Sequence, residues 1–148
     1  MPSADRQAHA VWQGDLFSGE GEVTFDSSSI GTYPVTWSSR VEQPSGRTSP
    51  EELVAAAHAA CYAMAFSNVL AQNGTTAERL HVTATVSLGD NPGGGIRVTR
   101  SQLEVAGQVP GLDQASFQRL AEQAEQACPI SGALRGNLEI TVAAKLES

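Results

Sequence analysis

The sequence predicts an α+β protein in which antiparallel sheets pack around a long, buried central helix. Segments of alternating polar and apolar residues fill the first third of the 148-residue chain, and a long apolar stretch follows at 50–72. Alternating segments then resume, with a second helical pattern between the last two of them. The predicted order is therefore βββ-α-ββ-α-β, in a single domain over residues 1–148.

Three strands are expected before residue 50, at 8–12, 22–26 and 33–41. The second alternates polar and apolar residues, as a strand buried on one face does. The third contains the β-branched residue Thr36 between two apolar neighbours, a composition favoured in strands. A turn-forming run at 43–46 ends it.

The clearest helix start in the chain follows. Ser49 can act as N-cap, Pro50 occupies the first helical position, and Glu52 completes a capping box. The helix is expected to reach about residue 72, because Gly74 provides a C-terminal stop just beyond.

Period-two alternation resumes at 80–88 and continues at 96–109, and the glycine-rich turn at 91–95 should join these segments as a hairpin. Although the turn contains three consecutive glycines, it leads into a strand. A phosphate-binding loop would lead into a helix.

A second helix should begin at the cap Asp113 and end at Cys128, because Pro129 disfavours helical geometry in the residue before it. Its apolar residues recur at helical spacing. A last strand is expected at 138–142.

The net charge of −7 argues against a nucleic-acid partner, since binding a phosphate backbone requires a basic face. A membrane span at 53–71 is also disfavoured, because this segment contains His58 and Asn68 and many alanines. The N-terminus lacks the pattern of a signal peptide. We therefore expect a cytoplasmic protein.

The first helix has almost no polar face between residues 53 and 66. One sheet can cover only one side of such a helix. A second copy of the chain is the simplest cover for the other side, which predicts a homodimer.

Two cysteines are the candidates for chemistry. Cys61 lies within the first helix among small apolar residues, where it is either a structural thiol or a nucleophile that needs a nearby cation. Cys128 lies at the junction between a helix and a proline, where it is either packed or free to move as a resolving thiol. Their positions in the sequence do not pair them.

A metal site at His58 and Cys61 is disfavoured. The two residues are one helical turn apart, but a metal requires three or four ligands. Besides the cysteines, the sequence offers only His9 and His81, and no ligand spacing recurs. A core or interface hydrogen-bonding role suits His58 better.

The stretch at 48–61, which runs from Thr48 to Cys61, resembles the signature of the OsmC/Ohr family, the osmotically inducible and organic hydroperoxide resistance proteins. The stretch at 127–131, around Cys128 and Pro129, resembles the second cysteine motif of that family. The resemblance covers essentially the whole chain in element order. It is closer to the OsmC branch, because Ohr proteins typically have Tyr in place of His58.

The resemblance implies an intertwined homodimer that reduces organic hydroperoxides without a cofactor. It implies that Cys61 attacks the peroxide and becomes a sulfenic acid, that Cys128 condenses with it to a disulfide, and that a dithiol such as dihydrolipoamide is the reductant. Arg40 matches the active-site arginine of the OsmC branch, with Arg47 as the alternative. Glu51 matches the glutamate that holds this arginine.

Glu51 and Cys61 are ten residues apart on one helix, or about 15 Å along its axis. This separation predicts that Glu51 serves the Cys61 of the other subunit, with the two helices antiparallel. Two other functions remain open. One is a redox sensor or stress-responsive binding protein that uses the same disulfide, and the other is a carrier of lipophilic ligands.

Overall fold

The computed structural model describes residues 3–147, so the two ends of the predicted domain, Met1 with Pro2 and Ser148, lie outside it. The chain divides into two compact units, Met1–Pro50 and Glu51–Ser148. The prediction of one domain over the whole chain stays a prediction. The α+β class and the predicted order of the main elements are confirmed.

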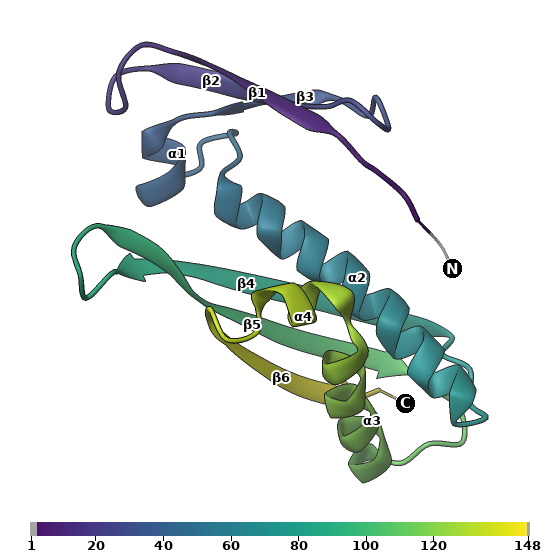
Figure 1. Ribbon diagram of the computed structural model, residues 1–148. Coiled ribbons are helices and arrows are strands. Elements are labelled where there is room, and N and C mark those ends of the chain that lie inside the picture. The colour runs from purple at the N-terminus through teal and green to yellow at the C-terminus, as the bar shows by residue number, and fades with distance from the viewer. Residues whose placement is uncertain (1–2, 148) are drawn as a thin grey trace. The chain divides into compact units, whose positions relative to one another are not determined.

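The first unit contains a three-stranded antiparallel sheet in the order β1-β2-β3 (purple to blue in Figure 1). Its strands are β1 (Ala8–Gln13), β2 (Glu20–Phe25) and β3 (Thr32–Val35). None of the apolar side chains described in this unit is buried. The sheet therefore carries exposed aromatic and aliphatic groups that a stable protein would cover.

The third strand is shorter than expected, because a helix replaces its second half. β3 ends at Val35, and α1 (Trp37–Val41) follows. The Oγ1 of Thr36 accepts the amide of Ser39 at 3.0 Å, and the amide of Thr36 donates to the Oγ of Ser39 at 3.0 Å. This reciprocal capping box makes Thr36 a helix N-cap instead of the strand residue that its β-branched side chain suggests.

The helix α2 (Pro50–Gln72) has the predicted bounds, and from Glu51 on it belongs to the second unit. A three-stranded sheet in the order β4-β5-β6 follows, formed by β4 (Arg79–Asp90), β5 (Ile96–Gln108) and β6 (Glu139–Leu146). Between the last two strands lie α3 (Gln114–Ala127) and the short α4 (Pro129–Leu134). The predicted hairpin of β4 and β5 is confirmed, as is the cap of α3 at Asp113.

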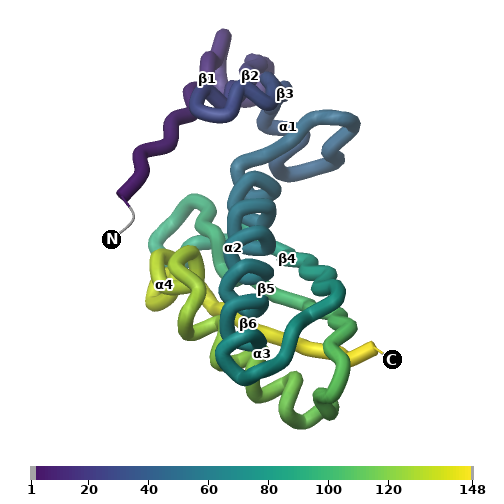
Figure 2. Tube along the Cα trace, turned by 90° about the vertical axis from the view of Figure 1, so that its right-hand side faces the viewer, coloured from purple at the N-terminus to yellow at the C-terminus, as the bar shows by residue number. Residues whose placement is uncertain are grey.

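The expectation of purely antiparallel sheets is wrong for one pair of strands, because β6 runs parallel to β5. A parallel pair needs a long crossover between its strands, and α3 with α4 provides it. Figure 2 shows the second unit along a different direction, with α2 and α3 both beside the sheet.

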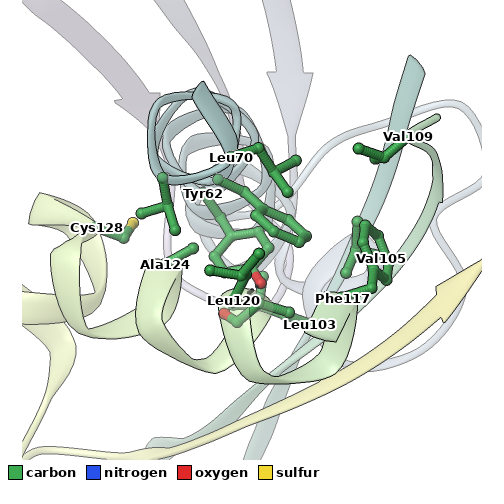
Figure 3. Packing of buried hydrophobic residues seen from close by; sticks show 12 residues of the cluster. Tyr62, Leu70, Leu103, Val105, Val109, Phe117, Leu120, Ala124 and Cys128 are labelled. Carbon is green, nitrogen blue, oxygen red and sulfur yellow. Dashed lines mark hydrogen bonds between the residues drawn. The ribbon is translucent and has the colours of Figure 1, made fainter. Parts of the chain in front are cut away.

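The core of the second unit lies between this sheet and the two longer helices (Figure 3). Leu103 and Val105 point to the same face of β5 because they are two residues apart. Phe66 of α2 and Phe117 of α3 meet over this face, with ring centroids 5.0 Å apart. These buried contacts fix α2 and α3 against the sheet, and therefore fix the residues that follow α3.

α2 is long and apolar enough to cross a membrane by length and composition, but 28% of its most apolar window is buried in the chain. The buried side faces the core through Tyr62, Phe66 and Leu70. Met64, on another side, is 71% exposed. The helix is therefore packed on one side, and its other side is exposed in the single chain.

Candidate active site

Packing of α2 against α3 brings the two cysteines together. The Sγ of Cys61 lies 3.3 Å from the Sγ of Cys128, although the residues are 67 positions apart in the sequence. Cys128 is 1% exposed and Cys61 is partly exposed, and both are free thiols. Cys61 is therefore the sulfur that a reagent from solvent reaches first, with Cys128 directly behind it.

Cys128 occupies the corner between the two C-terminal helices, as C-cap of α3 and N-cap of α4. Pro129 makes this corner, because it fits the first turn of a helix but cannot continue the preceding one. Within the first turn of α4, the amide of Ser131 donates to the Sγ of Cys128 at 3.5 Å. The backbone amide of Ile130 hydrogen-bonds the sulfur of Cys61. Adjacent amides of one helical turn thus face the two sulfurs.

Burial raises the pKa of Cys61, because a buried thiolate loses its hydration. The amide of Ile130 lowers this pKa in part. The neighbouring Cys128 raises it again, through its hydrogen bond with Cys61 and through charge repulsion. A reactive Cys61 thiolate therefore requires a further source of positive potential.

His58 lies one helical turn before Cys61 and is fully buried. Its Nδ1 is 2.6 Å from the Oγ of Ser101 on β5, and its Nε2 is 2.7 Å from the Oγ of Ser131 on α4. Burial lowers the pKa of His58, an effect that Glu125 partly offsets, so the imidazole is neutral at neutral pH. The expected hydrogen-bonding role of His58 is thus confirmed.

Tyr62, the neighbour of Cys61, is fully buried and donates its hydroxyl proton to the carbonyl of Ala121 at 2.7 Å. Burial raises the pKa of Tyr62 far above the physiological range. The phenol therefore stays protonated, and it fixes α2 to α3 (Figure 3).

An ion pair spans the corner that holds Cys128. The Nη2 of Arg135 lies 2.9 Å from the Oε1 of Glu125 and donates to the carbonyl of Glu125 at 3.0 Å. Glu125 belongs to the last turn of α3 and Arg135 caps α4. The pair connects the two helices on either side of Cys128.

The predicted arginine and its alternative both lie in the first unit. Arg40 is in the last turn of α1. Arg47 lines a cavity of about 340 Å³ together with the carboxylates of Glu20 and Glu22. Glu51 begins the second unit near the start of α2 and is 7% exposed. The assignments of Arg40 and Glu51 stay predictions.

Contacts of Ser101, of the amide of Ile130 and of the hydroxyl of Ser131 were not predicted from the sequence. One signal was available for Ser101: it is a polar residue at an inward position of β5, two residues before Leu103. Ile130 and Ser131 lie in the stretch at 127–131 that resembles the second cysteine motif, but the spacing assigns neither of them a contact. For metal ligands, residues 3–147 contain no group of three or more His, Cys, Asp or Glu side chains that could hold an ion.

The family model described as OsmC-like protein matches residues 43–143. The chain is 39% identical over 143 residues to the peroxiredoxin OsmC of Escherichia coli strain K12, with 97% of each chain covered. It is 41% identical over 97 residues to the organic hydroperoxide resistance protein of Xanthomonas axonopodis pv. citri, covering 64% of this chain and 65% of that one.

The fold also resembles the crystal structure of an organic hydroperoxide resistance protein from Elizabethkingia anophelis. The TM-score is 0.74 at 26% identity, with 99% of this chain and 100% of that chain covered.

Mild oxidation with diamide should link Cys61 and Cys128 within one chain, because their sulfurs already lie 3.3 Å apart. Closing a loop between residues 67 apart should raise the free energy of unfolding by about 4 kcal/mol, chiefly by restricting the unfolded chain. Urea unfolding of the oxidised and reduced protein measures the change, and peptide mapping without reductant identifies the link. The Cys128→Ser variant should gain no stability on the same treatment. A link between chains, or no gain in the native protein, would contradict the geometry.

Proposed function

The chain belongs to the OsmC-like protein family, and on that premise we propose that it is a cysteine-based peroxidase that reduces organic hydroperoxides to alcohols. The observation that carries this proposal is the contact between the two sulfurs, one partly exposed and one buried behind it. A relative named as a peroxiredoxin, 39% identical over nearly the whole chain, supports the same activity.

In the first step the Cys61 thiolate attacks the outer oxygen of the hydroperoxide. A sulfur–oxygen bond forms, the oxygen–oxygen bond breaks, and the alkoxide leaves and takes up a proton to become an alcohol. Cys61 is oxidised to a sulfenic acid and the peroxide is reduced. Small apolar neighbours on α2, together with the exposed Met64 one turn later, favour an organic substrate over hydrogen peroxide.

In the second step the sulfur of Cys128 attacks the sulfur of Cys61. The disulfide forms, the sulfur–oxygen bond breaks, and hydroxide leaves with the proton of Cys128 as water. An external dithiol, such as dihydrolipoamide, then reduces the disulfide and is itself oxidised. A reducing compartment such as the cytoplasm suits this cycle, because its reductants keep the two cysteines as thiols.

Arg40 supplies the positive potential that Cys61 needs. A guanidinium close to the sulfur stabilises the thiolate and offers hydrogen bonds to the peroxide oxygens. Arg40 is preferred over Arg47, because it matches the active-site arginine of the OsmC branch.

The working unit is a homodimer. The exposed apolar side chains of the first sheet and the open side of α2 need a cover, and a second copy is the simplest one. If Glu51 of one copy serves the Cys61 of the other on antiparallel helices, the helices cross near residue 56. The residues there are alanines, and Ala56 and Ala57 are exposed, so two backbones can approach closely.

The peroxidase activity should depend on both cysteines. With dihydrolipoamide as reductant, kcat/KM for cumene hydroperoxide should exceed that for hydrogen peroxide by about tenfold, the factor that about 1.4 kcal/mol of apolar contact provides. Cys61→Ser should lose activity by about a thousandfold or more. Cys128→Ser should react once and then accumulate sulfinic acid at Cys61. A Cys61→Ser protein as active as the native one would refute the proposal. A native protein that reacts once and stops would favour a redox sensor.

Arg40→Ala should raise the pKa of Cys61, because a lost cation no longer favours the thiolate. The pH dependence of Cys61 alkylation by iodoacetamide, measured in a Cys128→Ser background, gives this pKa. Arg47→Ala is the matched control and should leave the pH dependence of Cys61 alkylation unchanged. If Arg47→Ala moves the profile and Arg40→Ala does not, the assignment of the arginine is reversed.

Mixing two inactive variants tests the role of Glu51 across the dimer. In a heterodimer of Glu51→Ala and Cys61→Ser chains, one site combines an intact Cys61 with an intact Glu51 from the other copy. About a quarter of the native activity should return after the chains are exchanged, because half of the dimers are then heterodimers and each has one intact site of two. If Glu51 acts within its own chain, no site is complete and mixing restores nothing.

A further inference from the structure

Resolution of the Cys61 sulfenic acid depends on where Cys128 is held, and the contacts around it extend to a buried imidazole. Cys128 itself is fixed by the corner between α3 and α4 and by the amide of Ser131. The side chain of Ser131 faces His58 at 2.7 Å. One residue of α4 therefore contacts Cys128 through its backbone and α2 through its hydroxyl.

We propose that His58 is a positioning residue for resolution: with Ser101 and Ser131 it forms a buried relay that holds the first turn of α4 and Cys128 against Cys61. The relay crosses three elements, from Ser101 on β5 through His58 on α2 to Ser131 on α4. All three side chains are fully buried.

Burial keeps the imidazole of His58 neutral, which sets how many hydrogen bonds it can donate and accept. A neutral imidazole has one N–H donor and one acceptor nitrogen, so it accepts from one serine and donates to the other. Away from water, a lost hydrogen bond here leaves a polar group unsatisfied, which costs more than the bond itself contributes at a surface. α4 is a short helix, and Ser131 is its buried residue. The contact with His58 therefore fixes the helix turn whose amides face both sulfurs.

The position matters because resolution competes with a second oxidation. A sulfenic acid that waits for its partner can react with another peroxide and become a sulfinic acid, which a dithiol does not restore. Small displacements of a reacting atom reduce rates strongly, since reacting groups must lie close and aligned. Loosening α4 should thus slow disulfide formation more than it slows the first attack by Cys61.

Two serine variants separate this role from simple stability. Ser131→Ala keeps the backbone amide that donates to Cys128 and removes only the hydroxyl that faces His58. Ser101→Ala removes a hydroxyl from the other nitrogen of the same imidazole, on a strand that does not carry a cysteine. Each change removes one buried hydrogen bond to His58, so both variants should lose a similar amount of free energy of unfolding.

The experiment mixes each reduced protein with one equivalent of cumene hydroperoxide and resolves the two steps in time. Peroxide consumption reports the first step, and acid quenching followed by thiol alkylation and mass analysis reports the disulfide. In Ser131→Ala the first step should slow less than disulfide formation does, although the amide of Ile130 in the same turn also bonds the sulfur of Cys61. Disulfide formation should be about tenfold slower, and sulfinic acid should accumulate in excess peroxide. Ser101→Ala keeps the contact between His58 and Ser131, so it should slow disulfide formation less than Ser131→Ala does.

This inference rests on the proposed peroxidase function, and a second oxidant distinguishes the failure of one from the failure of the other. Diamide adds to one thiol, and the second thiol displaces it as the reduced hydrazine, so the same two sulfurs pair without peroxide. Ser131→Ala should again pair them about tenfold more slowly, whether or not the native protein consumes peroxide. Native pairing rates in Ser131→Ala with both oxidants would overturn the proposal. Equal slowing in Ser101→Ala and Ser131→Ala would also overturn it, because the effect would then be general loosening.

Discussion

The contact between the sulfurs of Cys61 and Cys128 is the constraint that the packing of the second unit satisfies and on which the proposed chemistry depends. A sulfur on a long helix and one at a helix corner, 67 residues apart, lie 3.3 Å from each other. This distance requires α2 and α3 to be fixed on one face of the sheet. Phe66, Phe117 and the hydroxyl of Tyr62 fix them there by close packing and a buried hydrogen bond.

The same burial that fixes the sulfurs opposes their ionisation. It raises the pKa of Cys61, and the second sulfur raises it further. The amide of Ile130 offsets part of this effect, and a guanidinium would supply the rest. The site thus separates two tasks. The second unit aligns the sulfurs, and charge brought by Arg40 would activate one of them. Under the proposed function, such a division would let a half-buried thiol react.

Local patterns in the sequence predicted much of this architecture. The helix start at Pro50, the cap at Asp113 and the break at Pro129 gave the bounds of α2 and α3, because helix ends depend on adjacent residues. The helix after Thr36 was missed, since its capping box uses Ser39 where Glu or Gln is usual. The parallel direction of β6 depends on tertiary packing, as do the distance between the sulfurs and the pairing of His58 with Ser101. Alternation and spacing carry no information about them.

The central claim is that one peroxide molecule oxidises both cysteines of one chain. Titration of the fully reduced protein with an organic hydroperoxide, followed by counting of the remaining thiols, tests it most directly. The account predicts that one equivalent of hydroperoxide removes both thiols of a chain, yields one equivalent of the alcohol and leaves a link between Cys61 and Cys128 within that chain. Loss of a single thiol per equivalent, with Cys128 still reduced, would contradict it.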